Sequence, residues 1–347
     1  MNRGMKTPAL SVVIPAYNRI EPLKVTLRSA RSAAEGLDVE TLLVDDGSSP
    51  MLAEQLAGSE LGSLSIIRQS NQGSIVARMA GLAAARGKHV LFLDSDDLVH
   101  PRKFSVQLAA LEAGGCDVCY SDMAVAVPNA GSLAGSFAPS SRLPATSQPE
   151  ELFLRIQPSP HNPIYRRDYL LRLLERPIVP VDRRFDPAGD VWLYYNLAPF
   201  PALIRKVDEP LTAVGEHDED RFSRQWERIA VAALLTCREF AARCPRTPDT
   251  LAARIRAGEC AFDGWRRLPR GMHRGFEDAT LELWRGAPRG PVANLGTGRF
   301  AWLSRLLGPE TAGRLLRRLR NGSYEDCRTL SPEEFDRLFS TAGLGPP

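Results

Sequence analysis

The fold is indicated most clearly by residues 90–97, Val-Leu-Phe-Leu-Asp-Ser-Asp-Asp, where four apolar residues run directly into three carboxylates within four positions. Such a run predicts a buried parallel strand that ends at the carboxyl edge of a sheet, where open α/β folds bind their ligands. Clustered carboxylates repel one another unless a cation is present. The simplest partner for them is a hard divalent cation with oxygen ligands, held beside a phosphate.

The composition is that of an ordinary globular protein, with 347 residues, 44% hydrophobic and 24% charged. This length predicts one large domain plus an appendage. No apolar run approaches the roughly 20 residues that span a bilayer, and the N-terminus lacks the apolar region of a secretory signal, so a cytoplasmic location is expected. Six cysteines fit a reducing compartment. Cys116 and Cys119 have the spacing of a redox motif, but their neighbours indicate a strand, so a redox or metal role is not favoured.

Charge is distributed unevenly along the chain. Residues 221–320 carry 20 Arg and no Lys against 9 acids, a net charge of +11, whereas residues 321–347 carry −3 and residues 1–220 carry −5. The simplest interpretation of the basic region is a solvated helical surface. Nucleic-acid binding is not expected, because this region has no Lys, no recognised motif and dispersed charges.

Strand and helix patterns alternate four times in the N-terminal part. Strands are expected at residues 10–15, 41–44, 64–68 and 90–93, and helices at 22–34, 51–56 and 74–85. This alternation predicts a parallel, doubly wound sheet. The first, second and fourth strands each end in polar residues: Tyr17 and Asn18, then Asp45 and Asp46, then Asp94 to Asp97. Parallel strands bring these ends to one edge, which predicts a single cleft there.

The rest of the chain divides into a mixed and a helical part. A helix is expected at 101–113, a strand at 116–127, and a Ser- and Pro-rich loop at 128–149 that shapes an acceptor site; further helices are expected at 229–240, 251–261, 300–307 and 312–319. These patterns give a domain at 1–225 and a mainly helical region at 226–347. The basic, amphipathic residues 314–320 predict either a Leu face that packs on the first domain, which is favoured, or contact with an anionic membrane surface or acidic polymer.

Four motifs occur in order along the chain. They are Ser-Val-Val-Ile-Pro-Ala-Tyr-Asn-Arg (11–19), Val-Asp-Asp-Gly-Ser-Ser (44–49), Asn-Gln-Gly (71–73) followed by Ala77 and Arg78, and Leu-Asp-Ser-Asp-Asp (93–97). Together they resemble family 2 glycosyltransferases of the GT-A fold, over about residues 8–220. The resemblance implies a Rossmann-like, doubly wound mixed sheet. It also implies a metal-dependent, inverting hexosyltransferase that moves a sugar from a nucleotide diphosphate donor, a UDP-sugar, to a hydroxyl of a glycan, lipid-linked or small-molecule acceptor in cell-envelope polysaccharide biosynthesis.

The resemblance assigns donor-binding residues. Pro15, Tyr17 and Asp46 match positions of the nucleobase pocket, where an aromatic face covers the base and a carboxylate accepts an imide N–H. For residues 45–49 the alternative is a strand-to-helix turn in which Ser48 or Ser49 caps the next helix. Arg78 matches a position that reaches the donor phosphates, with a surface arginine as the alternative.

Asp94 and Asp96 match the DXD motif of the family, which implies that they hold Mn²⁺ or Mg²⁺ against the diphosphate. Alternation along a strand would point both side chains to the same side. Ser95 between them offers the donor a hydroxyl. His217 matches a late histidine near the metal, with a solvated loop histidine as the alternative.

Asp190 matches the residue that supplies the general base, in a segment where Gly189 replaces the commoner acid. An inverting transfer needs one carboxylate to take the proton of the attacking hydroxyl. The alternative role is the N-cap of the following helix, and the two roles are compatible. Asp97 is expected to cap or charge-balance the helix that opens near Pro101, and His161 either faces the acceptor or has no role.

Two other functions are compatible with parts of the pattern. A sugar-phosphate nucleotidylyltransferase shares the sheet and a metal aspartate, but it expects a Gly-rich loop after the first strand, and residues 16–19 contain no glycine. The other is a catalytically silent protein that binds sugar nucleotides. The presence of Asp94, Asp96 and Asp190 argues against it.

Overall fold

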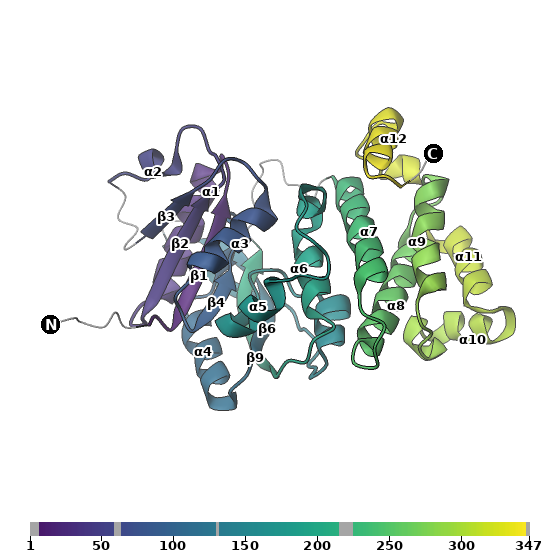
Figure 1. Ribbon diagram of the computed structural model, residues 1–347, viewed down its shortest axis with the longest axis horizontal. Coiled ribbons are helices and arrows are strands. Elements are labelled where there is room, and N and C mark those ends of the chain that lie inside the picture. The colour runs from purple at the N-terminus through teal and green to yellow at the C-terminus, as the bar shows by residue number, and fades with distance from the viewer. Residues whose placement is uncertain (1–6, 59–63, 130–131, 215–224, 345–347) are drawn as a thin grey trace. The chain divides into compact units, whose positions relative to one another are not determined.

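The computed structural model describes residues 7–58, 64–129, 132–214 and 225–344 (Figure 1). The chain forms two compact units. The first contains residues 1–152, 156–177 and 201–218, and the second contains residues 153–155, 178–200 and 219–347. The chain therefore crosses between the units more than once, and the second unit includes two short pieces from the middle of the sequence. The domain division at residue 225 stays a prediction.

The first unit is built on one mixed sheet. Its strand order is β3-β2-β1-β4-β8-β6-β9-β5, with β7 paired to β6. The strands are β1 (Leu10–Ala16), β2 (Val39–Asp45), β3 (Leu64–Arg68), β4 (His89–Phe92), β5 (Leu98–Val99), β6 (Val118–Asn129), β7 (Ser132–Ser141), β8 (Ile164–Arg166) and β9 (Ile204–Val214). The first four strands pair in parallel, and β8 joins β4 in the antiparallel direction. This confirms the predicted doubly wound, mixed α/β sheet.

Helices lie against both faces of this sheet. They are α1 (Ile20–Ala33), α2 (Leu52–Gln55), α3 (Ser74–Ala84), α4 (Lys103–Gly114) and α5 (Arg167–Leu174). Val12 and Ile14 of β1 share one buried cluster with apolar residues of α1 and α4. Val13 points the other way, as strand alternation requires, and contacts α3. Because β1 is buried on both faces, its sequence is a nearly continuous apolar run.

The pairing of the strands determines where the predicted site lies. β1 pairs with β2 on one side and β4 on the other, all in parallel, so the residues that follow these strands meet at one edge. The adjacency expected from the polar strand ends is therefore confirmed.

The predicted loop at residues 128–149 is wrong in its first part. Residues 132–141 form β7, which pairs antiparallel with β6 and has two register shifts. Pro139 is paired with Ala124, next to one of the shifts, where a proline is tolerated because the ladder is already interrupted. A strand paired to a long neighbour needs no apolar alternation of its own, so the Ser- and Pro-rich composition concealed it.

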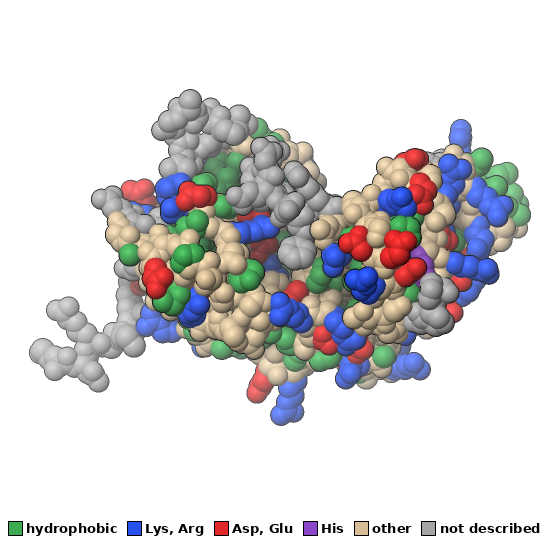
Figure 2. Space-filling view, turned by 90° about the horizontal axis from the view of Figure 1, so that it is seen from above, with side chains coloured by type: hydrophobic (Ala, Val, Ile, Leu, Met, Phe, Trp, Pro, Cys, Tyr) green, Lys and Arg blue, Asp and Glu red, His purple; other side chains and the backbone are tan. Residues whose placement is uncertain are grey.

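The second unit is helical. Its helices are α6 (Gly189–Leu197), α7 (Trp226–Arg243), α8 (Leu251–Arg267), α9 (Arg274–Gly286), α10 (Gly298–Leu307), α11 (Pro309–Arg320) and α12 (Pro332–Thr341). Five of them were predicted near these positions, including the helix expected after Asp190, whereas α9 and α12 were missed. Phe262 packs on Trp265, Trp284 and Phe300 in the core of this unit. Basic side chains are scattered over the visible surface (Figure 2). Among the described residues, no helix is long and apolar enough to span a membrane.

A substitution at Gly81 tests the packing of α3 on the sheet. A Cβ at this position would lie 2.2 Å from Cγ1 of Val13, so Gly81→Ala should destabilise the first unit by about 1–3 kcal/mol through overpacking. Gly264→Ala is the control, because this helical glycine has open space around it. There we expect a stabilisation of roughly 0.5–1 kcal/mol from helix propensity. Urea unfolding measures both, and equal effects of the two substitutions would contradict the packing of α3.

Candidate active site

The loops after β1 and β2 are joined by hydrogen bonds. Asn18, in the left-handed region at φ 52°, donates its N–H to Oγ of Ser48 (3.0 Å), and its Oδ1 accepts the N–H of Ser49 (2.9 Å). Asparagine adopts this conformation more readily than most residues. The two loops therefore form one unit at the carboxyl edge of the sheet.

Asp45 organises the start of α2. Its carboxylate accepts the N–H of Ser48 (2.8 Å) and of Leu52 (3.2 Å) and pairs with Arg68. Burial raises the pKa of Asp45, but these hydrogen bonds outweigh it and hold the pKa below its usual value. The expectation that Ser48 or Ser49 caps α2 is wrong. The N-cap residue, Met51, makes no capping hydrogen bond with its side chain, and the side chain of Asp45 accepts the N–H of Leu52, the first residue of the helix.

Asp46 forms hydrogen bonds to a third loop, the one between β3 and α3. Its side chain is buried and accepts hydrogen bonds from Nε2 of Gln69 (2.7 Å) and from the N–H groups of Gln72 (2.8 Å) and Gly73 (2.9 Å). These use three of the about four lone-pair sites of a carboxylate. Asp46 thus fixes the turn that leads into α3, and its contact with a nucleobase stays a prediction.

The other two residues predicted for the nucleobase differ in exposure. Pro15 is buried within β1, whereas Tyr17 in the following loop is 48% exposed. An exposed aromatic ring on a loop held by its neighbours has a face free for stacking on a flat ligand.

The acidic residues 94–97 form a turn. β4 ends at Phe92, and the N–H of Asp97 donates to the carbonyl of Asp94 (3.2 Å). The strand alternation that was expected to align Asp94 with Asp96 is therefore wrong. The turn instead brings Asp94 close to Asp97, because residues i and i+3 approach each other in a turn.

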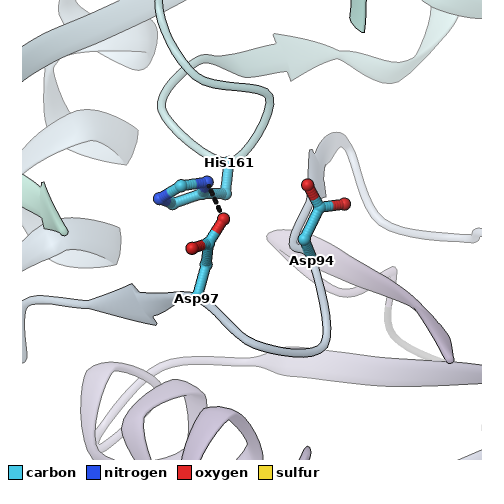
Figure 3. A group of neighbouring side chains, drawn as sticks. All are labelled: Asp94, Asp97 and His161. Atoms are coloured by element: carbon cyan, nitrogen blue, oxygen red, sulfur yellow. Dashed lines mark ion pairs between the residues drawn. The ribbon is translucent and has the colours of Figure 1, made fainter. Parts of the chain in front are cut away.

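Asp94, Asp97 and His161 form a cluster whose ligand atoms all lie within 4.8 Å of one another (Figure 3). Nδ1 of His161 pairs with Oδ2 of Asp97 (2.8 Å), and Nε2 lies 3.2 Å from the carbonyl of Ala213. Carboxylate oxygens and an imidazole suit Mn²⁺, and carboxylates alone suit Mg²⁺. Asp94, whose side chain is 28% exposed, is the most accessible of the three ligands, whereas Asp97 and His161 are buried and pair with each other.

One of the two roles expected for Asp97, and one of those expected for His161, is wrong. The N-cap of α4 is Arg102, with no side-chain cap, so Asp97 does not cap this helix. His161 is fully buried, so it does not face an acceptor. It holds Asp97 in place instead.

Two arginines pair with carboxylates of the turn at residues 94–97. Arg19 pairs with Asp96 (2.8 Å) and Arg78 of α3 pairs with Asp94 (2.6 Å). Arg78 is buried, so the alternative of a surface arginine is wrong. Ser95, between the paired acids, is also buried. Guanidinium groups at this place have the geometry to bind a diphosphate as well as a carboxylate.

A buried lysine that was not predicted supports the loop of His161. Nζ of Lys103 donates to the carbonyl of Asn162 (2.6 Å), to Oγ1 of Thr212 (2.9 Å) and to Oε1 of Gln107 (2.5 Å). Burial lowers the pKa of Lys103 to about 7. The network connects α4 and β9 to the residue that follows His161, so it positions the histidine.

The remaining predicted residues are Asp190 and His217. Asp190 belongs to the second unit, at the second position of α6, where its Oδ1 accepts the N–H of Val191 (2.9 Å). The N-cap is Ala188, so the alternative role of Asp190 as N-cap is wrong. An acid in the first turn still complements the helix dipole. His217 lies outside the described residues.

Comparisons with known proteins agree with the motifs. Residues 11–171 match the model of glycosyl transferase family 2. The succinoglycan biosynthesis protein ExoO of Rhizobium meliloti is 31% identical over 175 residues, 48% of this chain and 49% of that protein. An undecaprenyl-phosphate 4-deoxy-4-formamido-L-arabinose transferase of Enterobacter is 40% identical over 115 residues, 31% of this chain and 35% of that protein. The chain thus spans about half or less of these relatives.

Solved structures share the fold. TarS 1–349 of S. aureus in complex with UDP-GlcNAc has a TM-score of 0.61 at 17% identity, covering 90% of this chain and 92% of that chain. The mannosyltransferase PcManGT of Pyrobaculum calidifontis in complex with GDP-Man and Mn²⁺ has a TM-score of 0.51 at 14% identity, covering 91% and 84%. The structural neighbours confirm the predicted GT-A fold, and residues 11–171 match the predicted family.

Lys103 should give the stability a characteristic pH dependence. Its pKa falls from 10.5 to about 7 on folding, so between these values the unfolded chain binds a proton that the folded chain does not. Stability from this group therefore decreases as the pH falls through this window and is constant below pH 7. Relative to Lys103→Met, the wild type should gain roughly 3–5 kcal/mol between pH 7 and 10.5.

Urea unfolding across this pH range measures the difference. Lys24→Met, which removes a partly exposed lysine of α1, is the control. A difference between wild type and Lys103→Met that does not change with pH would contradict the burial of the ammonium group.

Proposed function

We propose that this chain, whose residues 11–171 form a glycosyltransferase family 2 domain, transfers a sugar from a nucleoside diphosphate to a hydroxyl group with inversion at the anomeric carbon. The observation that supports this proposal is the carboxyl edge of β2, β1 and β4, where three joined loops lie at the same sheet edge as an acidic cluster. The nucleotidylyltransferase alternative is not favoured by any feature of this edge.

The donor side of the proposal uses the joined loops. Tyr17 covers the base, and the remaining acceptor capacity of Asp46 takes the imide N–H of uracil. Arg78 leaves Asp94 and donates to the diphosphate, beside the hydroxyl of Ser95. UDP is the proposed nucleotide, since the neighbour TarS is described with UDP-GlcNAc.

The proposed ion is Mn²⁺ or Mg²⁺, and PcManGT is described with Mn²⁺. Asp94 is a ligand in both versions of the site. The family motif adds Asp96 and His217, whereas the geometry favours Asp97 as the second carboxylate. When bound, the ion neutralises the diphosphate as it departs.

The acceptor side of the proposal relies on Asp190. This carboxylate takes the proton of the acceptor hydroxyl while the oxygen attacks the anomeric carbon from the face opposite the diphosphate. The named relatives support a glycan or lipid-linked acceptor in cell-envelope polysaccharide synthesis.

Peripheral contact with an anionic membrane is part of the proposal. The expectation that residues 314–320 pack a Leu face on the first domain stays a prediction. Leu319 in this stretch is 73% exposed, and Trp302 and Leu306 of α10 are also exposed. Apolar and basic side chains lie together at the end of the second unit that Figure 1 labels α10 and α11 (Figure 2). Exposed apolar residues beside arginines are typical of helices that lie in a membrane interface.

The two versions of the metal site give different results for two variants. If the geometry is correct, Asp97→Asn abolishes Mn²⁺ binding in the presence of UDP, and Asp96→Asn weakens it by less than about tenfold. Isothermal titration with Mn²⁺ measures both. The reverse order of the two variants would support the motif, and Mn²⁺ binding that survives Asp94→Asn would contradict both versions.

Replacement of the base separates transfer from binding. Asp190→Asn should keep binding of the donor and lower the rate of transfer by about 10²–10⁴-fold, the usual contribution of a general base. Release of nucleoside diphosphate is followed with a panel of nucleotide sugars and Mn²⁺. Asp182→Asn is the control, because Asp182 is a half-buried acid that accepts an N–H at the start of a helical turn in the same unit. Transfer by Asp190→Asn at the wild-type rate would show that another group is the base.

Membrane contact is measured by co-sedimentation with vesicles. Wild type should bind vesicles that contain phosphatidylglycerol more strongly than neutral vesicles, and Trp302→Ser with Leu306→Ser should lose most of this binding. Leu203→Ser is the control, because Leu203 is as exposed as Trp302, at 62%, but belongs to the first unit. Unchanged binding by the double variant would exclude α10 as the contact.

A further inference from the structure

The second unit contains a pocket that none of the predicted donor, metal or base residues lines. It lies among α7, α8 and α9 and has a volume of about 670 Å³. This value is within the range of about 300–1,000 Å³ that is usual for small-molecule sites. The pocket belongs to a part of the chain outside the matched family region, so the family does not explain it.

The pocket exists because the helices around it present small side chains. Ala241 of α7, Ala257 of α8 and Ala279 of α9 line it, and Leu283 supplies larger apolar surface, whereas Phe240 borders the pocket but is buried. The pocket is open to solvent, and Ala241 at its edge is exposed, so its apolar walls contact water. An apolar ligand that covers these walls removes their surface from water, which favours binding.

Three arginines give the pocket a strong positive charge. Arg238, Arg246 and Arg254 line it, against the single acid Glu282. Among the residues that the structure describes, none of the three arginines forms an ion pair, and Nε of Arg254 is buried without a hydrogen-bond partner. Arg238 and Arg246 are exposed, so they lie at the rim.

We propose that this pocket binds the phosphate headgroup and the first part of the hydrocarbon chain of a lipid phosphate. The chain fills the space lined by alanines and Leu283, and the phosphate lies at the rim against the arginines. Three guanidinium groups match the oxygens of a phosphate in charge and in geometry. A neutral lipid would leave these donors without partners, and a free phosphate would leave the apolar walls exposed.

Titration calorimetry of the full chain with decyl phosphate, below its micelle concentration, tests the proposal. The comparison ligands are decanol, which lacks the charge, inorganic phosphate, which lacks the chain, and decyltrimethylammonium, which has the opposite charge. Decyl phosphate should bind at least about tenfold more tightly than each of them, because only it uses both halves of the pocket.

Substitutions test the arginines and the apolar space of the pocket separately. Arg246→Gln and Arg254→Gln should each weaken decyl phosphate by about tenfold and leave decanol unchanged. Ala257→Leu should abolish binding of both by filling the space. Arg243→Gln is the control, since this exposed arginine of α7 pairs with Glu239 and does not line the pocket. Circular dichroism checks that each variant is folded, and the exposed Arg246 keeps the test valid if Ala257→Leu does not fold.

Three results would overturn the proposal. Decyl phosphate that binds no more tightly than decanol or inorganic phosphate would show that charge and chain do not act together. Binding that survives both Ala257→Leu and Arg246→Gln would place the ligand elsewhere. Self-association that is lost in Ala257→Leu, without binding of decyl phosphate, would show that a second copy of the chain covers the pocket. None of these measurements uses the transferase reaction, so the proposed function can fail or hold independently.

Discussion

Compensation of negative charge at the carboxyl edge of the sheet is the constraint on which the site depends. Five aspartates lie at the ends of β2 and β4, and each of them has an arginine, N–H groups or the ring of His161 as a partner. Asp45 and Asp46 use N–H groups to fix the loops, whereas Asp94 and Asp96 use arginines. Buried carboxylates need such partners, so the acids determine how the surrounding loops fold.

Much of this arrangement could be predicted from the sequence. The strands β1 to β4 are apolar runs bounded by polar residues, and the parallel pairing of β1 with β2 and β4 follows from their alternation with helices. The strand β7 was missed because pairing to β6 depends on backbone hydrogen bonds, which leave no side-chain pattern. The helix α9 was missed because its apolar stripe lies in a strongly charged segment.

The site was predicted less completely than the sheet. Asp94 follows its strand directly, so its place at the edge could be inferred. The pairing of Asp97 with His161 joins segments far apart in the sequence, and a turn rather than a strand sets the spacing of residues 94–97. Lys103 was missed because a lysine on a helix is usually exposed, although its place on the buried stripe of α4, one turn before Gln107, was a usable signal.

The pairs of Arg19 with Asp96 and of Arg78 with Asp94 have a consequence for the order of binding. Counted together, the five aspartates and the arginines 19, 68 and 78 leave this edge with an excess of negative charge. A bare diphosphate, itself an anion, is therefore repelled as it approaches. In the proposed transfer, a diphosphate already complexed with a divalent cation would carry less charge than a bare one, so the donor and its ion would enter this edge together.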